Sequence, residues 1–282
     1  MSNTEATLYE IKNGAAWITL NRPENRNALS AVLVTELFDH LKASNEDDAV
    51  RSIVITGSGP AFCAGADLKS PPGQLSEGSS RAVPYPDVLN AIMDSPKPVI
   101  AAINGAAFAG GLGLVGAADI VITKEDVQFS FSEVRIGVIP AVISVVCLPK
   151  LGTHHGMKLF LTGERFSGKQ AVEMGFAHRA VHEDELEKAV NEEIDALEAG
   201  LPALRDVMKA GGVMTVIAYH SVEDRAVKSA FREWSRACVC PAELPACMCR
   251  GHALGETLTR KVLRPTDEEV KRNPRARSAR LR

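Results

Sequence analysis

Two glycine-rich turns are the parts of this chain best suited to hold a reacting oxygen atom. The first lies in Phe62–Leu68 (FCAGADL) and follows the apolar run Ser52–Thr56. The second lies in Ala109–Leu114 (AGGLGL) and follows the apolar run Lys97–Ile103. Small residues let a ligand approach the main chain, and N–H groups at a helix start attract an anion. Two such turns could therefore bind one oxygen atom that becomes negatively charged.

Glu133 is the carboxylate best placed in the sequence to move a proton. It ends the run Phe129-Ser-Phe-Ser-Glu133. A carboxyl group within hydrogen-bond reach of the reacting proton, with a pKa tuned by a partly apolar pocket, acts as a general acid or base. The structural alternative is a glutamate on the surface or in an ion pair with Arg135. An anion site and a proton-transfer group together suit a reaction that passes through an enolate.

With Asn21-Arg-Pro23, these motifs occur in the order and spacing of a known family. Over roughly residues 8 to 195 the chain resembles the crotonase superfamily, also called the enoyl-CoA hydratase/isomerase family. The resemblance implies an α/β fold with a β/α spiral core and a C-terminal α-helical region. It also implies an acyl-CoA thioester as the substrate, with no metal and no redox cofactor, because coenzyme A is part of the substrate. The run Ser132–Ser144 looks most like bacterial methylglutaconyl-CoA hydratase-like enzymes.

The resemblance also assigns roles to residues by motif position. The backbone N–H groups of Ala66 and Gly110 would be the oxyanion donors, and Glu133 would be the acid and base. The residues expected to contact the substrate are Arg26, Ala28, Ala64, Ala66, Asp67, Leu68, Lys69, Gly110 and Gly111. Arg22 is a further candidate for contact with a phosphate of coenzyme A. Asp67 has a structural alternative as a helix N-cap.

The chain departs from the family's hydratases at Gly113. In those enzymes one glutamate lies three residues after the oxyanion-hole glycine and a second lies twenty residues further on. The matching positions here are Gly113 and Glu133, so one carboxylate is missing. A single carboxylate could still transfer protons between water and the substrate. We therefore expect hydration of a short or branched 2-enoyl-CoA. The alternatives are a Δ3-Δ2 enoyl-CoA isomerase with Glu133 as proton shuttle, and an acyl-CoA-binding protein without turnover.

The pattern of apolar residues predicts the elements that position these groups. A β-hairpin is expected over 7–12 and 16–20 around Asn13-Gly14, and a helix over 30–42 with Ser30 as N-cap. Further strands are predicted at 52–56, 98–103, 120–123 and 127–131, and helices from about 111, at 154–162, 168–174 and 184–198, and on to about 236. The segment 69–80, rich in proline, glycine and serine, is expected to be a loop beside the acyl pocket.

We expect a spiral core over residues 1–197 and a helical region over 198–282 with a divergent Cys-rich and basic tail. Four cysteines occur there as Cys238-x-Cys240 and Cys247-x-Cys249. Their one-residue gaps are shorter than the two to four residues typical of structural zinc sites, so the spacing predicts no metal site. Residues 271–282 carry six basic and no acidic residues, which is typical of a solvated tail.

The bulk composition limits the possible partners. The formal net charge is -3 and the pI is about 6.2, which give no global reason to expect nucleic acid or an anionic membrane. RNA binding, known for a member of the wider family, has support only in the basic tail. The first residues lack the pattern of a signal peptide, so a cytoplasmic location is expected. The resemblance implies a homotrimer, or a hexamer built as a dimer of trimers.

Overall fold

The computed structural model describes residues 5–69, 82–209, 211–218, 221–238, 240, 248–258, 263–272 and 280–281. The chain forms two compact units, Met1–Ile194 (unit 1) and Asp195–Arg282 (unit 2). The loop expected over 69–80 lies almost entirely outside the described residues. In the described part of the chain, no helix is both long and apolar enough to cross a membrane.

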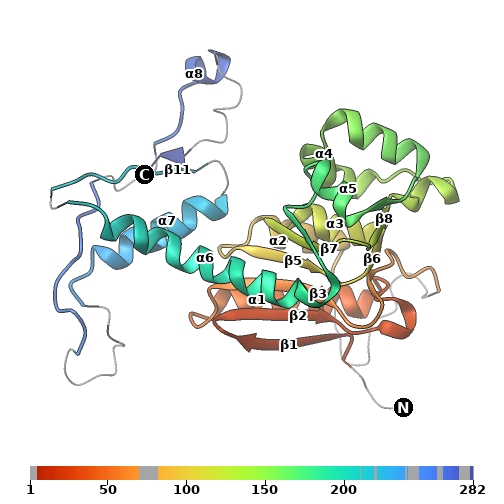
Figure 1. The fold of residues 1–282 in the computed structure, drawn as a ribbon, viewed down its shortest axis with the longest axis horizontal. Coiled ribbons are helices and arrows are strands. Elements are labelled where there is room, and N and C mark those ends of the chain that lie inside the picture. The colour runs from red at the N-terminus through yellow and green to blue at the C-terminus, as the bar shows by residue number, and fades with distance from the viewer. Residues whose placement is uncertain are drawn as a thin grey trace. The chain divides into compact units, whose positions relative to one another are not determined.

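Unit 1 is built on two sheets (Figure 1). The larger sheet has the order β1 (Thr7–Lys12), β2 (Ala15–Leu20), β3 (Ser52–Gly57), β5 (Val99–Ile103), β7 (Ile120–Lys124) and β10 (Arg179–Val181). The smaller sheet has the order β4 (Ala61–Cys63), β6 (Ala106–Phe108), β8 (Gln128–Ser130) and β9 (Phe166–Ser167). From β3 to β8, each turn of the chain adds a strand to the larger sheet and then one to the smaller sheet. This confirms the predicted α/β spiral.

In each of these two sheets, only the strand pair at one edge is antiparallel: β1 with β2 and β8 with β9. The hairpin of β1 and β2 turns at Asn13 and Gly14, whose φ angles are 51° and 73°. Those positive angles are what a tight Asn-Gly hairpin turn requires, so the predicted hairpin is confirmed. The strands β2, β3, β5, β7 and β10 then run parallel. In the smaller sheet β4, β6 and β8 are parallel, and β9 pairs with β8 in the antiparallel direction. The carboxyl ends of β4 and β6 therefore lead into neighbouring turns.

The helices of unit 1 connect and cover these strands. They are α1 (Ala31–Glu46), α2 (Tyr85–Met93), α3 (Gly110–Ala117), α4 (Ala141–Thr162), α5 (Gly168–Glu173) and the first part of α6 (Leu186–Asp206), with short 3-10 helices η1 (Pro23–Asn25), η2 (Ser132–Ile136) and η3 (Glu183–Glu185). The Ser30 hydroxyl accepts a hydrogen bond from the Leu33 N–H at 3.3 Å, which confirms the predicted N-cap. Helix α4 bends at Gly152, where φ is 67°.

Aromatic side chains fill the core beside the smaller sheet. The rings of Phe129 and Phe166 stack with centroids 5.3 Å apart, and Phe131 lies 6.3 Å from Phe166. Phe176 packs against the same cluster and has no exposed surface. Burial of each such side chain stabilises the fold by about 1.5–3 kcal/mol. Because Phe131 is anchored in this cluster, the start of η2 that follows it has a fixed position.

Unit 2 contains helices and a short strand pair. Its elements are the end of α6, β11 (Ile217–Ala218), α7 (Ser221–Trp234), α8 (Asp267–Arg272) and β12 (Arg280–Leu281), which pairs antiparallel with β11. The continuous helical pattern predicted to about residue 236 is wrong over 207–218, where the described residues are irregular or form β11. Gly211 has a φ of 80°, and two successive glycines weaken a helix, which explains the break. Trp234 is buried, and the Arg205 guanidinium lies 5.2 Å from its ring.

Candidate active site

The turn after β4 presents the backbone of Ala66. The Leu29 N–H donates to the Gly65 carbonyl at 2.8 Å, and the Asp67 N–H donates to the Leu29 carbonyl at 3.3 Å. This is a single parallel bridge between Leu29 and Ala66. Successive backbone groups of an extended segment point to opposite sides, so the Ala66 N–H points away from Leu29. Ala66 as a whole residue is exposed.

The turn after β6 presents the backbone of Gly110. Ala109 is the N-cap of α3 and has φ 46° and ψ -122°, a conformation that costs free energy for a residue with a side chain. Its N–H donates to the Ser130 carbonyl of β8 at 3.0 Å, which holds the turn in place. Gly110 is the first residue of α3, and the first N–H groups of a helix have no intrahelical acceptor.

The two turns touch each other, and both contact points are glycines. A Cβ atom on Gly65 would lie 2.9 Å from the Ala109 Cβ and 3.2 Å from the Gly110 nitrogen. A Cβ atom on Gly110 would lie 3.8 Å from the Ala66 nitrogen. Within the described residues, neither the Ala66 N–H nor the Gly110 N–H donates to a backbone carbonyl. The structure thus brings together the two amides that the sequence singled out.

An ion pair between Arg22 and Asp67 stabilises the turn after β4. The Arg22 Nη1 donates to the Asp67 Oδ2 at 2.8 Å and to the Ala28 carbonyl at 3.2 Å. The two side chains are only 20% and 5% exposed, so this ion pair is largely buried. Loss of one partner would leave a poorly solvated charge. The Asp67 Oδ1 accepts from the Lys69 N–H at 3.1 Å, so Asp67 closes a turn rather than capping a helix.

Asn27 is a structural residue of this region that the sequence analysis missed. Its side chain is wholly buried, accepts from the Arg22 N–H at 2.8 Å and donates to the Ala61 carbonyl at 2.8 Å. Its φ of 54° is one that asparagine tolerates better than most residues. The signal available in the sequence was an asparagine just after a proline-containing turn.

The remaining predicted contact residues surround the first turn or support the second. Arg26 is exposed, and its carbonyl accepts from the Ala64 N–H at 3.0 Å. Ala28 is buried, whereas Leu68 and Lys69 are exposed beside Ala66. Gly111 is buried against β4, because a Cβ atom there would lie 2.4 Å from the Cys63 carbonyl oxygen. Gly111 therefore acts in packing, and Arg26, Leu68 and Lys69 are the side chains that a ligand could reach.

Glu133 combines burial with an unsatisfied oxygen. It is the second residue of η2 and is half-buried. Its Oε2 is buried and has no hydrogen-bond partner among the described residues. Burial raises the pKa of this carboxyl group above its ordinary value, and a hydrogen bond to its own backbone opposes the rise. Arg135 does not pair with it and donates instead to the Gly163 carbonyl at 2.8 Å. The ion-pair alternative is therefore wrong, and Glu133 is suited to proton transfer.

Tyr85 explains why Gly113 carries no carboxylate. A Cβ atom on Gly113 would lie 2.5 Å from the Tyr85 hydroxyl oxygen and 2.7 Å from the Ile143 Cγ2. The space for a longer side chain is thus already filled. The Tyr85 hydroxyl donates to the carbonyl of Gly110, the residue that supplies one of the two amides. Tyr85 follows Pro84 at the start of α2, and nothing in the sequence links it to residues 110–113.

The Tyr85 hydroxyl keeps its proton in this position. Burial is the main cause that raises its pKa well above the ordinary value, and the nearby Glu133 carboxylate adds to the shift. A phenol with a raised pKa remains a hydrogen-bond donor near neutral pH. Tyr85 therefore orients the second turn and does not act as a base.

Comparison with known proteins gives two kinds of match. The family model for enoyl-CoA hydratase/isomerase matches residues 10–236. A probable enoyl-CoA hydratase from Rhizobium meliloti (strain 1021) is 36% identical over 201 residues, which cover 71% of this chain and 78% of that protein. The crystal structure of an enoyl-CoA hydratase from Mycobacterium avium is similar with a TM-score of 0.63 and 34% identity, over 80% of this chain and 83% of that chain.

The second kind of match is shorter and of higher identity. The ribosomal RNA small subunit methyltransferase H of Gemmatimonas aurantiaca is 57% identical over 94 residues. The match covers 33% of this chain and 30% of that protein, so this chain spans less than a third of that relative. Two unrelated kinds of protein thus resemble this one chain.

The contact between Tyr85 and Gly113 can be tested by a double-mutant cycle. We expect Gly113→Ala to lower the free energy of unfolding by about 1–3 kcal/mol, because the added methyl group overpacks the site. The cost is expected to be smaller in a Tyr85→Phe background, which lacks the nearest atom. Urea unfolding of the four proteins measures both costs. Equal costs in the two backgrounds would contradict this contact.

Proposed function

This chain belongs to the enoyl-CoA hydratase/isomerase family, and we propose that unit 1 adds water to the double bond of a short or branched 2-enoyl-CoA. The observation that carries the proposal is the contact between the turns of Gly65 and Gly110, which sets the Ala66 and Gly110 amides side by side. Glu133, whose Oε2 has no hydrogen-bond partner among the described residues, would supply the proton-transfer group. The run Ser132–Ser144 supports a methylglutaconyl-like, branched acyl group.

The two amides act on the thioester carbonyl oxygen. As water adds to Cβ, negative charge moves from the double bond onto this oxygen and forms an enolate. Ala66 and Gly110 would each donate one N–H to it, and the start of α3 adds a favourable field. Donors that are already fixed need no reorganisation during the reaction, and losing one commonly costs about 10²–10³ in rate.

Glu133 would transfer both protons of the reaction. In its ionised form it takes a proton from water as the water oxygen bonds to Cβ. It then gives a proton to Cα, so the sum of the steps is one water added across the double bond. Burial keeps the Glu133 pKa above its ordinary value, which makes the carboxylate a stronger base than an exposed glutamate. Tyr85 holds the Gly110 peptide through its hydrogen bond to the Gly110 carbonyl.

The single carboxylate also favours a second candidate, Δ3-Δ2 enoyl-CoA isomerisation. That reaction moves one proton between Cα and Cγ and needs no second group to hold a water. Gly113, whose side-chain space is closed by Tyr85, supports this candidate. Both reactions use the same amides and the same glutamate, so the product distinguishes them.

The hydratase proposal predicts a specific loss in a Glu133→Gln variant. With crotonyl-CoA and with 3-methylglutaconyl-CoA, we expect the wild-type protein to decrease the absorbance of the conjugated enoyl thioester. Glu133→Gln is expected to lower kcat by about 10²–10⁴ and to leave thioester binding in place, because the amides are unchanged. The wild-type kcat is expected to fall as the pH is lowered, because Glu133 must be ionised to act as the base. The apparent pKa of this fall is expected to lie above the ordinary glutamate value.

The matched control for this experiment is Glu173→Gln, on an exposed part of α5. It removes the same charge far from the turns in sequence and is expected to keep wild-type activity. Conversion of a 3-enoyl thioester without hydration would favour the isomerase. Binding of both thioesters with no turnover of any substrate would overturn both enzyme proposals and leave an acyl-CoA-binding protein.

We also propose that the chain assembles as a homotrimer or as a hexamer. Support comes from η2 and the start of α4, where exposed apolar side chains gather, including Ile136 (62%), Ile139 (76%) and Val145 (69%). Exposed apolar patches of this kind commonly mark interfaces. Light scattering after gel filtration is expected to give three or six chain masses, and a smaller mass for Ile139→Asp/Val145→Asp. A wild-type monomer would contradict the proposal, and Val207→Asp, on a side chain 79% exposed, is the control.

For unit 2 we infer a separate role in binding small-subunit ribosomal RNA. The shares of the chain matched by the hydratase and by the methyltransferase, 71% and 33%, correspond in size to units 1 and 2. The exposed Lys271 and Arg272 of α8 begin the basic tail, and cations of this kind bind phosphate groups. No methyl transfer is proposed, since less than a third of that relative is matched.

Fluorescence anisotropy with a labelled small-subunit ribosomal RNA fragment tests this role. We expect the full chain to bind, and Lys271→Gln/Arg272→Gln to bind more weakly with a shallower dependence on salt. Lys188→Gln, on the part of α6 in unit 1, removes a charge without touching the tail and is expected to bind like the wild type. No binding at low salt, or equal loss in the control, would contradict the inference.

A further inference from the structure

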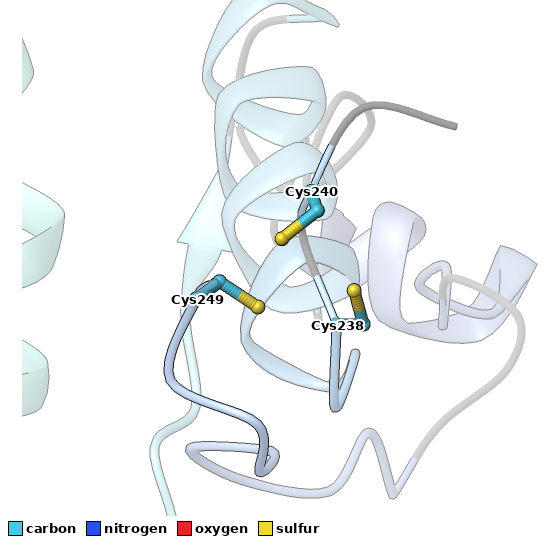
Figure 2. Close-up of side chains that lie close together, drawn as sticks. All are labelled: Cys238, Cys240 and Cys249. Atoms are coloured by element: carbon cyan, nitrogen blue, oxygen red, sulfur yellow. The ribbon is translucent and has the colours of Figure 1, made fainter. Parts of the chain in front are cut away.

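Three thiol groups of unit 2 lie close together although the chain separates them into two segments. Their sulfur atoms belong to Cys238, Cys240 and Cys249 and lie within 4.8 Å of one another. Figure 2 shows the three side chains converging, with Cys238 and Cys240 on one segment and Cys249 on another. Cys238 is exposed, and the other two are half-buried. The cluster forms just after α7, which ends at Trp234.

The distances suit a thiolate-bound metal ion. Zinc takes thiolate ligands at about 2.3 Å in a tetrahedron, which places neighbouring sulfur atoms about 3.8 Å apart. Sulfur atoms within 4.8 Å of one another reach that arrangement through side-chain rotation and small shifts. Soft thiolate ligands select zinc over magnesium or calcium, which prefer oxygen. The geometry therefore matches a zinc site better than the sequence spacing suggested.

The short gap within the first pair does not prevent common binding. In an extended backbone, residues i and i+2 project to the same side, so Cys238 and Cys240 can face one ion together. The third ligand then has to come from elsewhere in the chain, and the structure places Cys249 there. The gap of two to four residues is typical of two zinc ligands that belong to one tight turn. It does not apply to cysteines on an extended segment, so spacing alone does not exclude a metal site here.

Hydrogen bonds hold the segment of Cys249 against the end of α7. Arg250 follows Cys249, and its Nη1 donates to the Glu233 Oε1 at 3.0 Å while its Nη2 donates to the Arg236 carbonyl at 3.2 Å. The Arg250 side chain is only 19% exposed, so this anchor is well packed. The position of Cys249 beside the first pair is therefore supported by contacts outside the sulfur cluster.

A backbone amide also points at one of the sulfur atoms. The Met248 N–H donates to the Cys240 Sγ at 3.4 Å. Hydrogen bonds to ligand atoms orient the ligands of metal sites. This contact fixes the direction of the Cys240 sulfur atom relative to the segment that carries Cys249.

We propose that Cys238, Cys240 and Cys249 bind one zinc ion, with the fourth position taken by water. Cys247 lies outside the described residues and is not part of the proposed site. The ion joins the end of α7 to the segment that begins at Met248. It crosslinks a small unit, for which a bound metal is a common source of stability. The site does not depend on the proposed acyl-CoA chemistry of unit 1.

The metal content of the full chain tests the site directly. Protein purified under reducing conditions without chelator is expected to contain one zinc per chain by elemental mass spectrometry. Replacement of zinc by Co²⁺ is expected to give the visible bands of a tetrahedral site and a thiolate-to-metal charge-transfer band. Cys238→Ser and Cys249→Ser are each expected to lose the ion and these bands. Leu258→Ala, on a side chain 70% exposed in the same unit and outside the sulfur cluster, is the control and is expected to retain both.

A second measurement covers the case in which the cysteine variants fail to fold. In wild-type protein, added zinc is expected to protect Cys238, Cys240 and Cys249 from alkylation, as read by peptide mass spectrometry. Absence of zinc and of the cobalt bands under reducing conditions would overturn the proposal. The same conclusion follows if zinc protects none of the three thiols, or if two of them form a disulfide in the reduced preparation.

Discussion

The close approach of two backbone turns, at Gly65 and Gly110, is the constraint on which the candidate active site depends. The nearest backbone atoms leave no room for a side chain at Gly65, and Ala109 adopts a strained conformation beside it. Because β4 and β6 are parallel neighbours in the smaller sheet, the turns at their carboxyl ends lie at the same edge. The spiral order of the strands thus serves to bring two amides to one point.

Unit 1 also keeps one carboxyl group poorly solvated. The Glu133 Oε2 is buried without a partner in the described part of the chain, and burial raises its pKa. A carboxyl group whose pKa is higher in the folded than in the unfolded state favours folding while it is protonated. That contribution is lost as the pH rises through the interval between the two pKa values. The fold therefore tolerates a small cost near neutral pH in keeping this carboxyl group buried.

Much of this site was predictable because its signals are local in the sequence. Glycine-rich turns after apolar strands, an Asn-Gly hairpin and a serine N-cap each follow from a few adjacent residues, and the structure places them as expected. Tyr85 was not predictable, because its contact with Gly113 joins two helices that packing alone brings together. The sulfur cluster was missed for the same reason, since the spacing within each cysteine pair says nothing of how the pairs meet.

The helix expected over 207–218 was also not found, because Gly211 and Gly212 interrupt the helical pattern there, whereas helix returns at α7. The similarity to a ribosomal RNA methyltransferase covers 33% of the chain, which is about the size of unit 2. We assign the proposed hydratase chemistry to unit 1. There, the N–H groups of Ala66 and Gly110 would both bind the thioester oxygen atom.

The most direct test of that claim is the infrared spectrum of bound crotonyl-CoA labelled with ¹³C at the thioester carbonyl. Two hydrogen bonds from Ala66 and Gly110 would polarise the carbonyl, so its stretching frequency is expected to fall below the value in water. Gly110→Pro removes one donor at a helix position that accepts proline, and the frequency is expected to move back toward the value in water. A bound wild-type complex with the carbonyl frequency of free crotonyl-CoA would contradict the account.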